Sequence, residues 1–150
     1  MTETEERAAV VAEALTWLRT PWHDKGRVKG VGVDCAMFLA GVYETCGLIP
    51  RIEPKHYPRD WAMHRDEKLF EEWVSKFGRK IDAPQPGDVV LYQFGRVFSH
   101  GAIVIDWPRI IHADRRAGMV TLAEGDQDWL CKASGERAVS FWSFWPRVAA

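Results

Sequence analysis

A cysteine at the start of an expected helix is the strongest candidate for a reactive side chain in this sequence. Cys35 follows Asp34 and opens an uninterrupted, mostly apolar run that ends just before Gly47. Aspartate is favoured at the N-cap of a helix and glycine just after its last turn, so the pattern predicts a helix over residues 35–46. Backbone N–H groups and the helix dipole favour a thiolate in the first turn. Cys35 is therefore a candidate nucleophile.

A thiol nucleophile needs a base that takes its proton and a third group that orients the base. Two histidines lie in successive strand-like segments, with His100 near the start of one and His112 near the end of the next. In an antiparallel hairpin that turns at Trp107-Pro108, the start of the first strand lies beside the end of the second. Both imidazoles would then reach one edge of the sheet, where the helix with Cys35 could dock. The pattern permits a Cys–His–His triad.

Each of these side chains also has a structural interpretation. A buried cysteine behaves as a small apolar residue, and histidines in apolar strands are often hydrogen-bonded core residues. The three could also bind zinc, but no other residues have metal-ligand spacing, which disfavours a zinc site. Of the remaining candidates, we interpret Cys46 and Cys131 as structural, and His56 and His64 as exposed. Asp114 is interpreted as the end of its strand, with contact to a substrate amine as the alternative.

The order of helical and strand-like patterns predicts the fold class. Apolar spacing indicates amphipathic helices over residues 5–18 and 60–77, with a Thr-Pro pair ending the first and a glycine-bearing loop at 22–33. The strand-like segments are residues 88–94, 99–106, 109–113, 119–122 and 138–145. Helices followed by consecutive strands indicate one α+β domain over residues 1–150, with N-terminal helices packed on a C-terminal antiparallel sheet.

The composition excludes several classes of protein. The chain has 150 residues, of which 47% are apolar and 27% charged, the balance of a globular protein. A net charge of -1 provides no basic field for nucleic acid, and no apolar run has the length of a membrane span, so we expect neither partner. Three cysteines leave at least one thiol free, which fits synthesis in a reducing compartment. The acidic N-terminus lacks the features of a secretory signal, so we expect synthesis in the cytoplasm.

Short motifs occur in a fixed order over about two thirds of the chain. They are TPW at residues 20–22, DC at 34–35, PGDVV at 86–90, SHGAIV at 99–104 and IHA at 111–113. Together they resemble the NlpC family, a large group of papain-like cysteine peptidases that act on bacterial peptidoglycan. The resemblance implies a papain-like fold with Cys35 as nucleophile, His100 as general base and acid, and His112 orienting His100. It also implies a substrate in the peptidoglycan stem peptide, usually cut between D-glutamate and the diamino acid, with no metal or organic cofactor.

Two positions differ from the pattern common in that family. Met37 stands where glycine is common two residues after the cysteine, and Trp22 stands where tyrosine is common. Trp22 keeps a ring and one N–H donor but lacks the hydroxyl. We therefore expect the oxyanion hole to rest mainly on the backbone N–H of Cys35, helped by Trp22 or His23. Trp22, His23 and Asp34 are our candidates for contact with the substrate or the oxyanion.

The loop before Cys35 resembles the version found in peptidases of phage tails and gene-transfer agents. Its sequence over residues 25–33 is KGRVKGVGV. From this resemblance and the expected lack of a signal peptide, we predict a virion- or tail-associated peptidase with tail or baseplate proteins as partners. Two alternatives stay open: a structural tail-tip protein with weak or no catalysis, and a papain-like amidase or acyltransferase with another substrate.

Overall fold

The computed structural model describes residues 1–51, 66–94, 97–127, 130 and 139–146. The interpretations of His56, His64 and Cys131, and the start of the predicted helix over 60–77, lie outside the described residues. The helices are α1 (Glu3–Leu15), α2 (Cys35–Thr45) and α4 (Asp66–Phe77). The strands are β1 (Arg27–Val28), β2 (Gly32–Val33), β3 (Arg79–Ile81), β4 (Val89–Phe94), β5 (Val97–Asp106), β6 (Arg109–Asp114), β7 (Met119–Glu124) and β8 (Val139–Ser143).

The helix that carries Cys35 begins and ends where its capping residues predict. Asp34 is the N-cap of α2, and Gly47 follows the helix with φ 75°, a left-handed conformation that glycine adopts without strain. α1 ends at Leu15, earlier than the predicted residue 18. The hydroxyl of Thr16 donates to the carbonyl of Glu13 (2.6 Å), so a side chain competes with the backbone for the helix's last acceptors and a turn follows.

Six strands form one antiparallel sheet in the order β3-β8-β4-β5-β6-β7. The predicted hairpin of β5 and β6 is confirmed, with Ile103 opposite Ile111. Two features were not predicted. β3 pairs with β8, and β1 pairs with β2 inside the segment over 22–33 that we expected to be a loop. The strands β1, β2 and β3 are too short to show an alternating pattern in the sequence.

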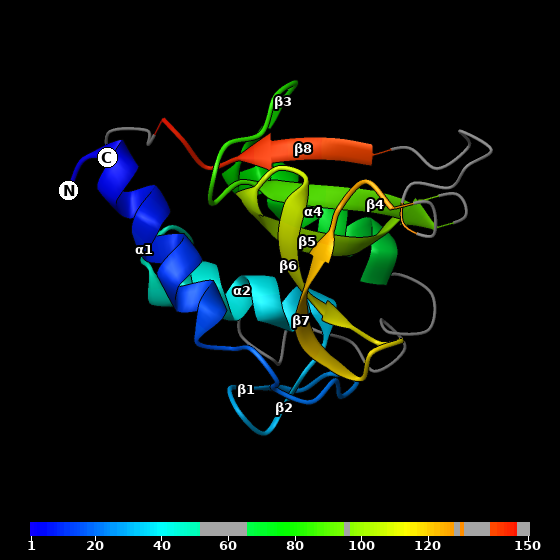
Figure 1. Cartoon of the computed structure of the whole chain (residues 1–150). Coiled ribbons are helices and arrows are strands. Elements are labelled where there is room, and N and C mark those ends of the chain that lie inside the picture. Colours follow the sequence, from blue (N-terminus) through cyan, green and yellow to red (C-terminus); the bar gives the residue numbers. More distant parts are fainter. Residues whose placement is uncertain (52–65, 95–96, 128–129, 131–138, 147–150) are drawn as a thin grey trace.

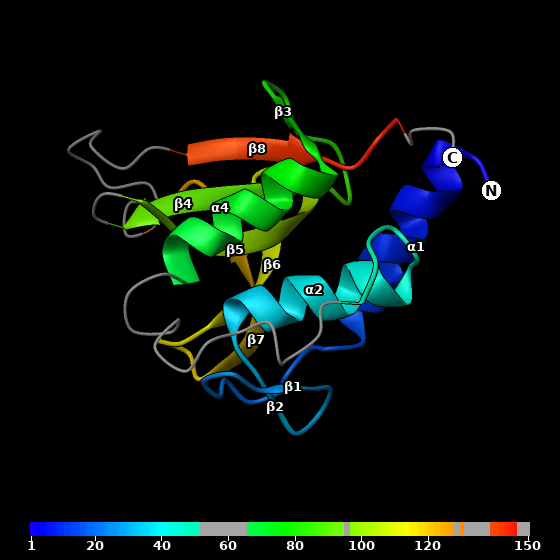
Figure 2. The ribbon, with the colours of Figure 1, turned by 180° about the vertical axis from the view of Figure 1, so that it is seen from behind.

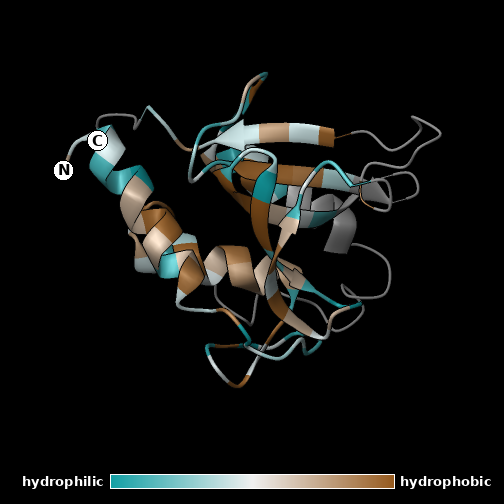
Figure 3. Cartoon of the chain, viewed as in Figure 1, coloured by the Kyte–Doolittle hydropathy of each residue, from teal (hydrophilic) through white to brown (hydrophobic). Residues whose placement is uncertain are grey.

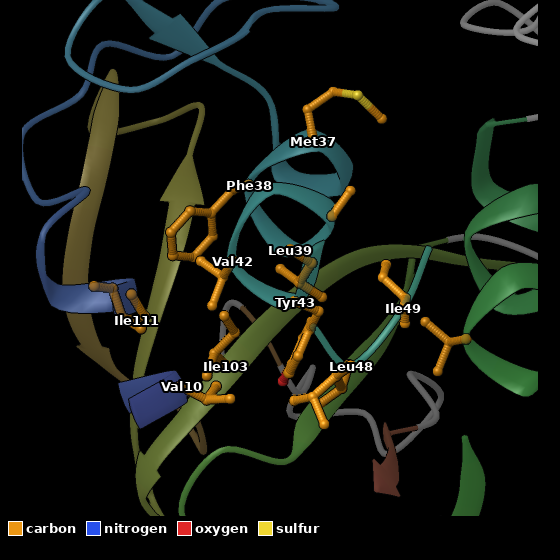
Figure 4. Close-up of a cluster of buried hydrophobic side chains, with 14 of the residues drawn as sticks. Val10, Met37, Phe38, Leu39, Val42, Tyr43, Leu48, Ile49, Ile103 and Ile111 are labelled. Atoms are coloured by element: carbon orange, nitrogen blue, oxygen red, sulfur yellow. The ribbon is translucent and has the colours of Figure 1, made fainter. Parts of the chain in front are cut away.

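The helices α2 and α4 cover one face of the sheet, and α1 packs beside α2 (Figures 1 and 2). The main hydrophobic cluster lies between these helices and the strands. In it Phe38 and Tyr43 of α2 lie near Ile103 of β5, whereas Met37 points away from the other labelled side chains (Figure 4). The prediction of N-terminal helices on an antiparallel sheet is confirmed.

The other face of the sheet carries a smaller hydrophobic cluster. Successive side chains of a strand point to opposite faces, so Val90 and Tyr92 of β4 lie there while their neighbours join the main cluster. Leu130, beyond the end of β7, is fully buried in this second cluster. Hydrophobic residues accordingly concentrate in the central strands and in α2, while the first turns of α1 are hydrophilic (Figure 3).

A buried arginine of α1, Arg7, forms an ion pair and a hydrogen bond with the residues just before β4. The guanidinium of Arg7 bonds the carboxylate of Asp88 (2.9 Å) and the carbonyl of Pro86 (2.9 Å) and lies over the ring of Trp145. Asp88 is fully buried, so its charge requires this partner. The contact fixes α1 against the turn that leads into β4.

Candidate active site

The two predicted histidines lie side by side across neighbouring strands. His100 Nε2 is 2.8 Å from His112 Nδ1, a hydrogen-bond distance, and the rings meet edge to face with centroids 5.0 Å apart. His100 stands opposite Tyr92 of β4, whose ring is tilted against it, and His112 stands opposite Thr121 of β7. Both histidines are buried, and His112 completely so. The hairpin thus brings together the two imidazoles that the sequence suggested.

Burial sets the charge of this histidine pair. The pKa of His100 is lowered from 6.5 to about 3, mainly because burial removes water from the ring and to a smaller extent because of the neighbouring His112. Burial also lowers the pKa of His112, and the carboxylate of Asp114 opposes that shift. Both rings are therefore neutral near neutral pH. A neutral imidazole can accept a proton, which is the property that a general base requires.

Cys35 occupies the first turn of α2, and Asp34 fixes the geometry of that turn. One carboxylate oxygen of Asp34 accepts from the backbone N–H of Met37 (2.8 Å) and the other from that of Lys25 (2.9 Å). Burial raises the pKa of Asp34, while these backbone donors oppose the shift. Cys35 is half-buried against the main cluster, and its helix packs on both β5 and β6. The helix that begins at Cys35 therefore packs on the two strands that carry the histidines.

The residues before Cys35 form a compact entry segment. His23 donates its backbone N–H to the carbonyl of Val33 (3.1 Å), and a Cβ on Gly32 would come within 2.9 Å of the His23 Cβ. A Cβ on Gly26 would lie 2.7 Å from the backbone of Gly32, so this fold of the segment needs both glycines. The His23 side chain is exposed, with Nδ1 2.9 Å from the carbonyl of Asp24.

Trp22 connects this entry segment to the strand that carries His112. Its backbone forms a bridge with Val33 and donates to the carbonyl of Gly118 (2.8 Å) in the turn after β6. The guanidinium of Arg115, from the same turn, lies 5.2 Å from the centroid of the Trp22 ring. Trp22, whose side chain is half-buried, thus joins the part of the chain that precedes Cys35 to the turn that follows His112.

Two residues near the histidines were not assigned to the site from the sequence. Tyr92 is fully buried, and its hydroxyl donates to the carbonyl of Gly125 (2.7 Å). Tyr92 could not be assigned to the site from the sequence, because its position beside His100 follows from the pairing of β4 with β5. Asp114 was interpreted as a strand end, although it follows His112 by two residues and so shares its face of the strand. This spacing of two residues was the feature of the sequence that could have placed Asp114 beside His112.

Among the described residues, no group of three or more histidine, cysteine, aspartate or glutamate side chains is placed to hold a metal ion. Within the same segments, no helix has both the length and the apolar character needed to cross a membrane.

The sequence model of the NlpC/P60 family matches residues 20–134, from the entry segment past the histidine pair. The chain belongs to the NlpC/P60 family. Its papain-like fold and the order of its motifs are those of this family, whose members are generally peptidoglycan hydrolases, though some are non-catalytic. A search of curated protein sequences gave no match.

Solved structures of NlpC/P60 proteins share the fold. The NlpC/p60 domain of the peptidoglycan hydrolase SagA superposes with a TM-score of 0.61 at 21% identity, over 89% of this chain and 96% of that one. A Bacillus cereus family member gives 0.65 at 21% identity, over 89% of this chain but only 39% of the longer protein. RipD from Mycobacterium tuberculosis, described as a non-catalytic domain adapted to peptidoglycan binding, gives 0.56 at 16% identity, over 92% and 96%.

Proposed function

We propose that the protein is a cysteine endopeptidase that hydrolyses an amide bond in the stem peptide of bacterial peptidoglycan. The observation that carries the proposal is the short contact between the buried rings of His100 and His112, in a family that generally hydrolyses peptidoglycan. Cys35 is the nucleophile, His100 the general base and acid, and His112 the residue that orients His100. The bond between D-glutamate and the diamino acid is the proposed point of cleavage.

The proposed reaction uses the nitrogen of His100 that faces away from His112. His100 accepts the thiol proton at Nδ1 as the Cys35 sulfur attacks the carbonyl carbon, and it then gives that proton to the leaving amine as the C–N bond breaks. A water molecule next loses a proton to His100 and attacks the thioester. The C–S bond then breaks, the acyl group leaves as the carboxylic acid, and His100 returns its proton to the sulfur to restore the thiol. The backbone N–H of Cys35, with Trp22 or His23 beside it, would stabilise the oxyanion.

Removal of the thiol tests this proposal directly. We expect wild-type protein to clear purified peptidoglycan in a zymogram, and Cys35→Ala to lose at least about a thousandfold in rate, because the nucleophile acts as a unit with its base. Cys46→Ala is the matched control, since Cys46 is a half-buried cysteine at the other end of the same helix. It should keep activity.

Three other outcomes would contradict the proposal or redirect it. Equal clearing by wild type and Cys35→Ala rules out Cys35 as the nucleophile. Binding to peptidoglycan without any clearing would place the protein with RipD, described as a non-catalytic binding domain. Mass spectrometry of defined muropeptides separates an endopeptidase from an amidase, because an amidase releases the whole peptide from the lactyl group of the sugar.

We propose a phage tail or gene-transfer agent as the setting in which the enzyme acts. The support is the resemblance of the loop over residues 25–33 to the version in such peptidases. In the structure this loop contains β1 and β2, and its Lys25 N–H bonds the N-cap of the nucleophile helix. We expect the protein in purified particles by mass spectrometry, together with tail or baseplate proteins. Particles that lack it would refute this setting without affecting the peptidase proposal.

A further inference from the structure

An acidic residue lies next to His112, facing the ring nitrogen that does not contact His100. Asp114 ends β6 two residues after His112, and its Oδ2 lies 3.9 Å from His112 Nε2. Its other oxygen, Oδ1, accepts from the backbone N–H of Arg116 (2.9 Å). Asp114 is 9% exposed, so little water screens its charge. The turn after β6 therefore holds a carboxylate against the far nitrogen of His112.

Two proton arrangements can satisfy the hydrogen bond between the histidines. Each neutral imidazole carries one N–H, so one ring donates to the other. If His100 Nε2 donates, His112 carries its proton on Nε2, facing Asp114, and His100 Nδ1 is left with a lone pair. If His112 Nδ1 donates instead, the lone pair of His112 Nε2 faces the carboxylate, and His100 Nδ1 carries a proton.

The two arrangements differ in energy because of the carboxylate. A negative charge 3.9 Å from His112 Nε2 attracts an N–H and repels a lone pair. It therefore favours the first arrangement, in which His100 is ready to accept a proton at Nδ1. The same charge also raises the pKa of His112, in the direction opposite to burial. When His100 becomes an imidazolium, its Nε2 proton already points at the acceptor nitrogen of His112.

We propose that Asp114 is a positioning residue that selects the base-competent tautomer of His100 through His112. It acts at the end of a relay that runs from its carboxylate to His112 and from there to His100. The consequence for catalysis rests on the proposed function, because only then does His100 serve as a base. The tautomer preference itself does not depend on any activity.

Asp114→Asn is the variant that separates this role from a structural one. The asparagine carbonyl can still accept from the Arg116 N–H, so the turn is kept, while the charge facing His112 is lost. We expect kcat to fall about tenfold with KM within about twofold, because the wrong tautomer reduces the fraction of competent enzyme and leaves substrate binding alone. Asp106→Asn, an exposed aspartate at the far end of β5, is the matched control and should match wild type.

The tautomer is measured directly from the ¹⁵N shifts of the imidazole nitrogens by NMR. In the wild type, we expect the proton of His112 on Nε2 and that of His100 on Nε2, leaving His100 Nδ1 unprotonated. In Asp114→Asn the His112 proton should redistribute between its two nitrogens, with the melting temperature unchanged. Asp114→Ala should show the same redistribution together with a lower melting temperature, because it also removes the turn acceptor.

The outcomes distinguish this inference from the proposed function. Unchanged wild-type tautomers in Asp114→Asn would overturn the inference, as would an unchanged kcat in a protein whose wild type is an active peptidase. A wild type without peptidase activity would refute the proposed function only. In that case the ¹⁵N shifts of wild type and Asp114→Asn still decide whether the carboxylate sets the tautomer.

Discussion

His100 and His112 are held in the sheet where water cannot stabilise a charge on either ring, and this couples the site to the stability of the fold. An unfolded chain exposes both imidazoles, which then titrate near the ordinary value of 6.5. The folded chain keeps the pKa of His100 near 3. Between these values the unfolded state binds a proton that the folded state does not, so the free energy of unfolding must fall as the pH falls.

Acidification from pH 7 to pH 5 should therefore destabilise the protein through His100 by about 2 kcal/mol, measured by urea unfolding at each pH. His100→Gln removes the titrating group and should flatten the dependence, although it also costs stability at pH 7. His23→Gln is the control, because His23 is exposed in the entry segment, and its pH dependence should match wild type. Parallel curves for wild type and His100→Gln would mean that His100 is not buried as a neutral ring.

The position of Cys35, the proposed nucleophile, depends on the boundary between the entry segment and α2 rather than on a single contact. Asp34 ends the entry segment and begins α2, and its two oxygens bond one backbone N–H from each. The helix start and the loop beside it are thus set by the same carboxylate. The β1–β2 pair and the close approach of Gly26 to Gly32 hold the remainder of the loop.

The attachment of α1 is the contact between elements on which we expect stability to depend most. Arg7→Met would leave Asp88 buried without its ion-pair partner, and should lower the free energy of unfolding by about 3–5 kcal/mol in urea titrations. Lys29→Met breaks a pair with Glu13 whose lysine is 41% exposed, and should cost less than about 1 kcal/mol.

A double variant tests the origin of the Arg7 effect. Adding Asp88→Asn to Arg7→Met removes the buried, unpaired carboxylate charge and keeps a side-chain oxygen that accepts from the backbone N–H of Gln85. It should recover part of the lost stability. No recovery would show that the cost comes from lost packing against Trp145 instead.

At the scale of the whole molecule, the sequence was most informative where signals are local. The N-cap at Asp34, the glycine after α2 and the turn at Trp107-Pro108 each depend on neighbouring residues, and the structure confirms the helix and the hairpin that they predicted. The pairing of β5 with β6 then places the two histidines together without further information.

Features that depend on distant residues could not be predicted in this way. Arg7 and Asp88 are separated by 81 positions, and neither stands out until the fold brings them together. The early end of α1 arises from a hydroxyl of Thr16 that competes for a backbone carbonyl, which apolar spacing does not register. Asp114 is intermediate, because its spacing from His112 is local but its meaning depends on how the turn directs its carboxylate.

The chain that precedes Cys35 also pairs with one edge strand of the sheet. A border strand with free backbone groups is a template onto which another chain can add, which leads to aggregation. Along β7, Val120 bonds to both Arg19 and Thr20 and so has its N–H and C=O satisfied from within the chain. The opposite border, β3, is only three residues long and carries exposed Arg79 and Lys80. The hydrogen bonds from Arg19 and Thr20 to Val120 therefore also hinder strand-to-strand association at this edge.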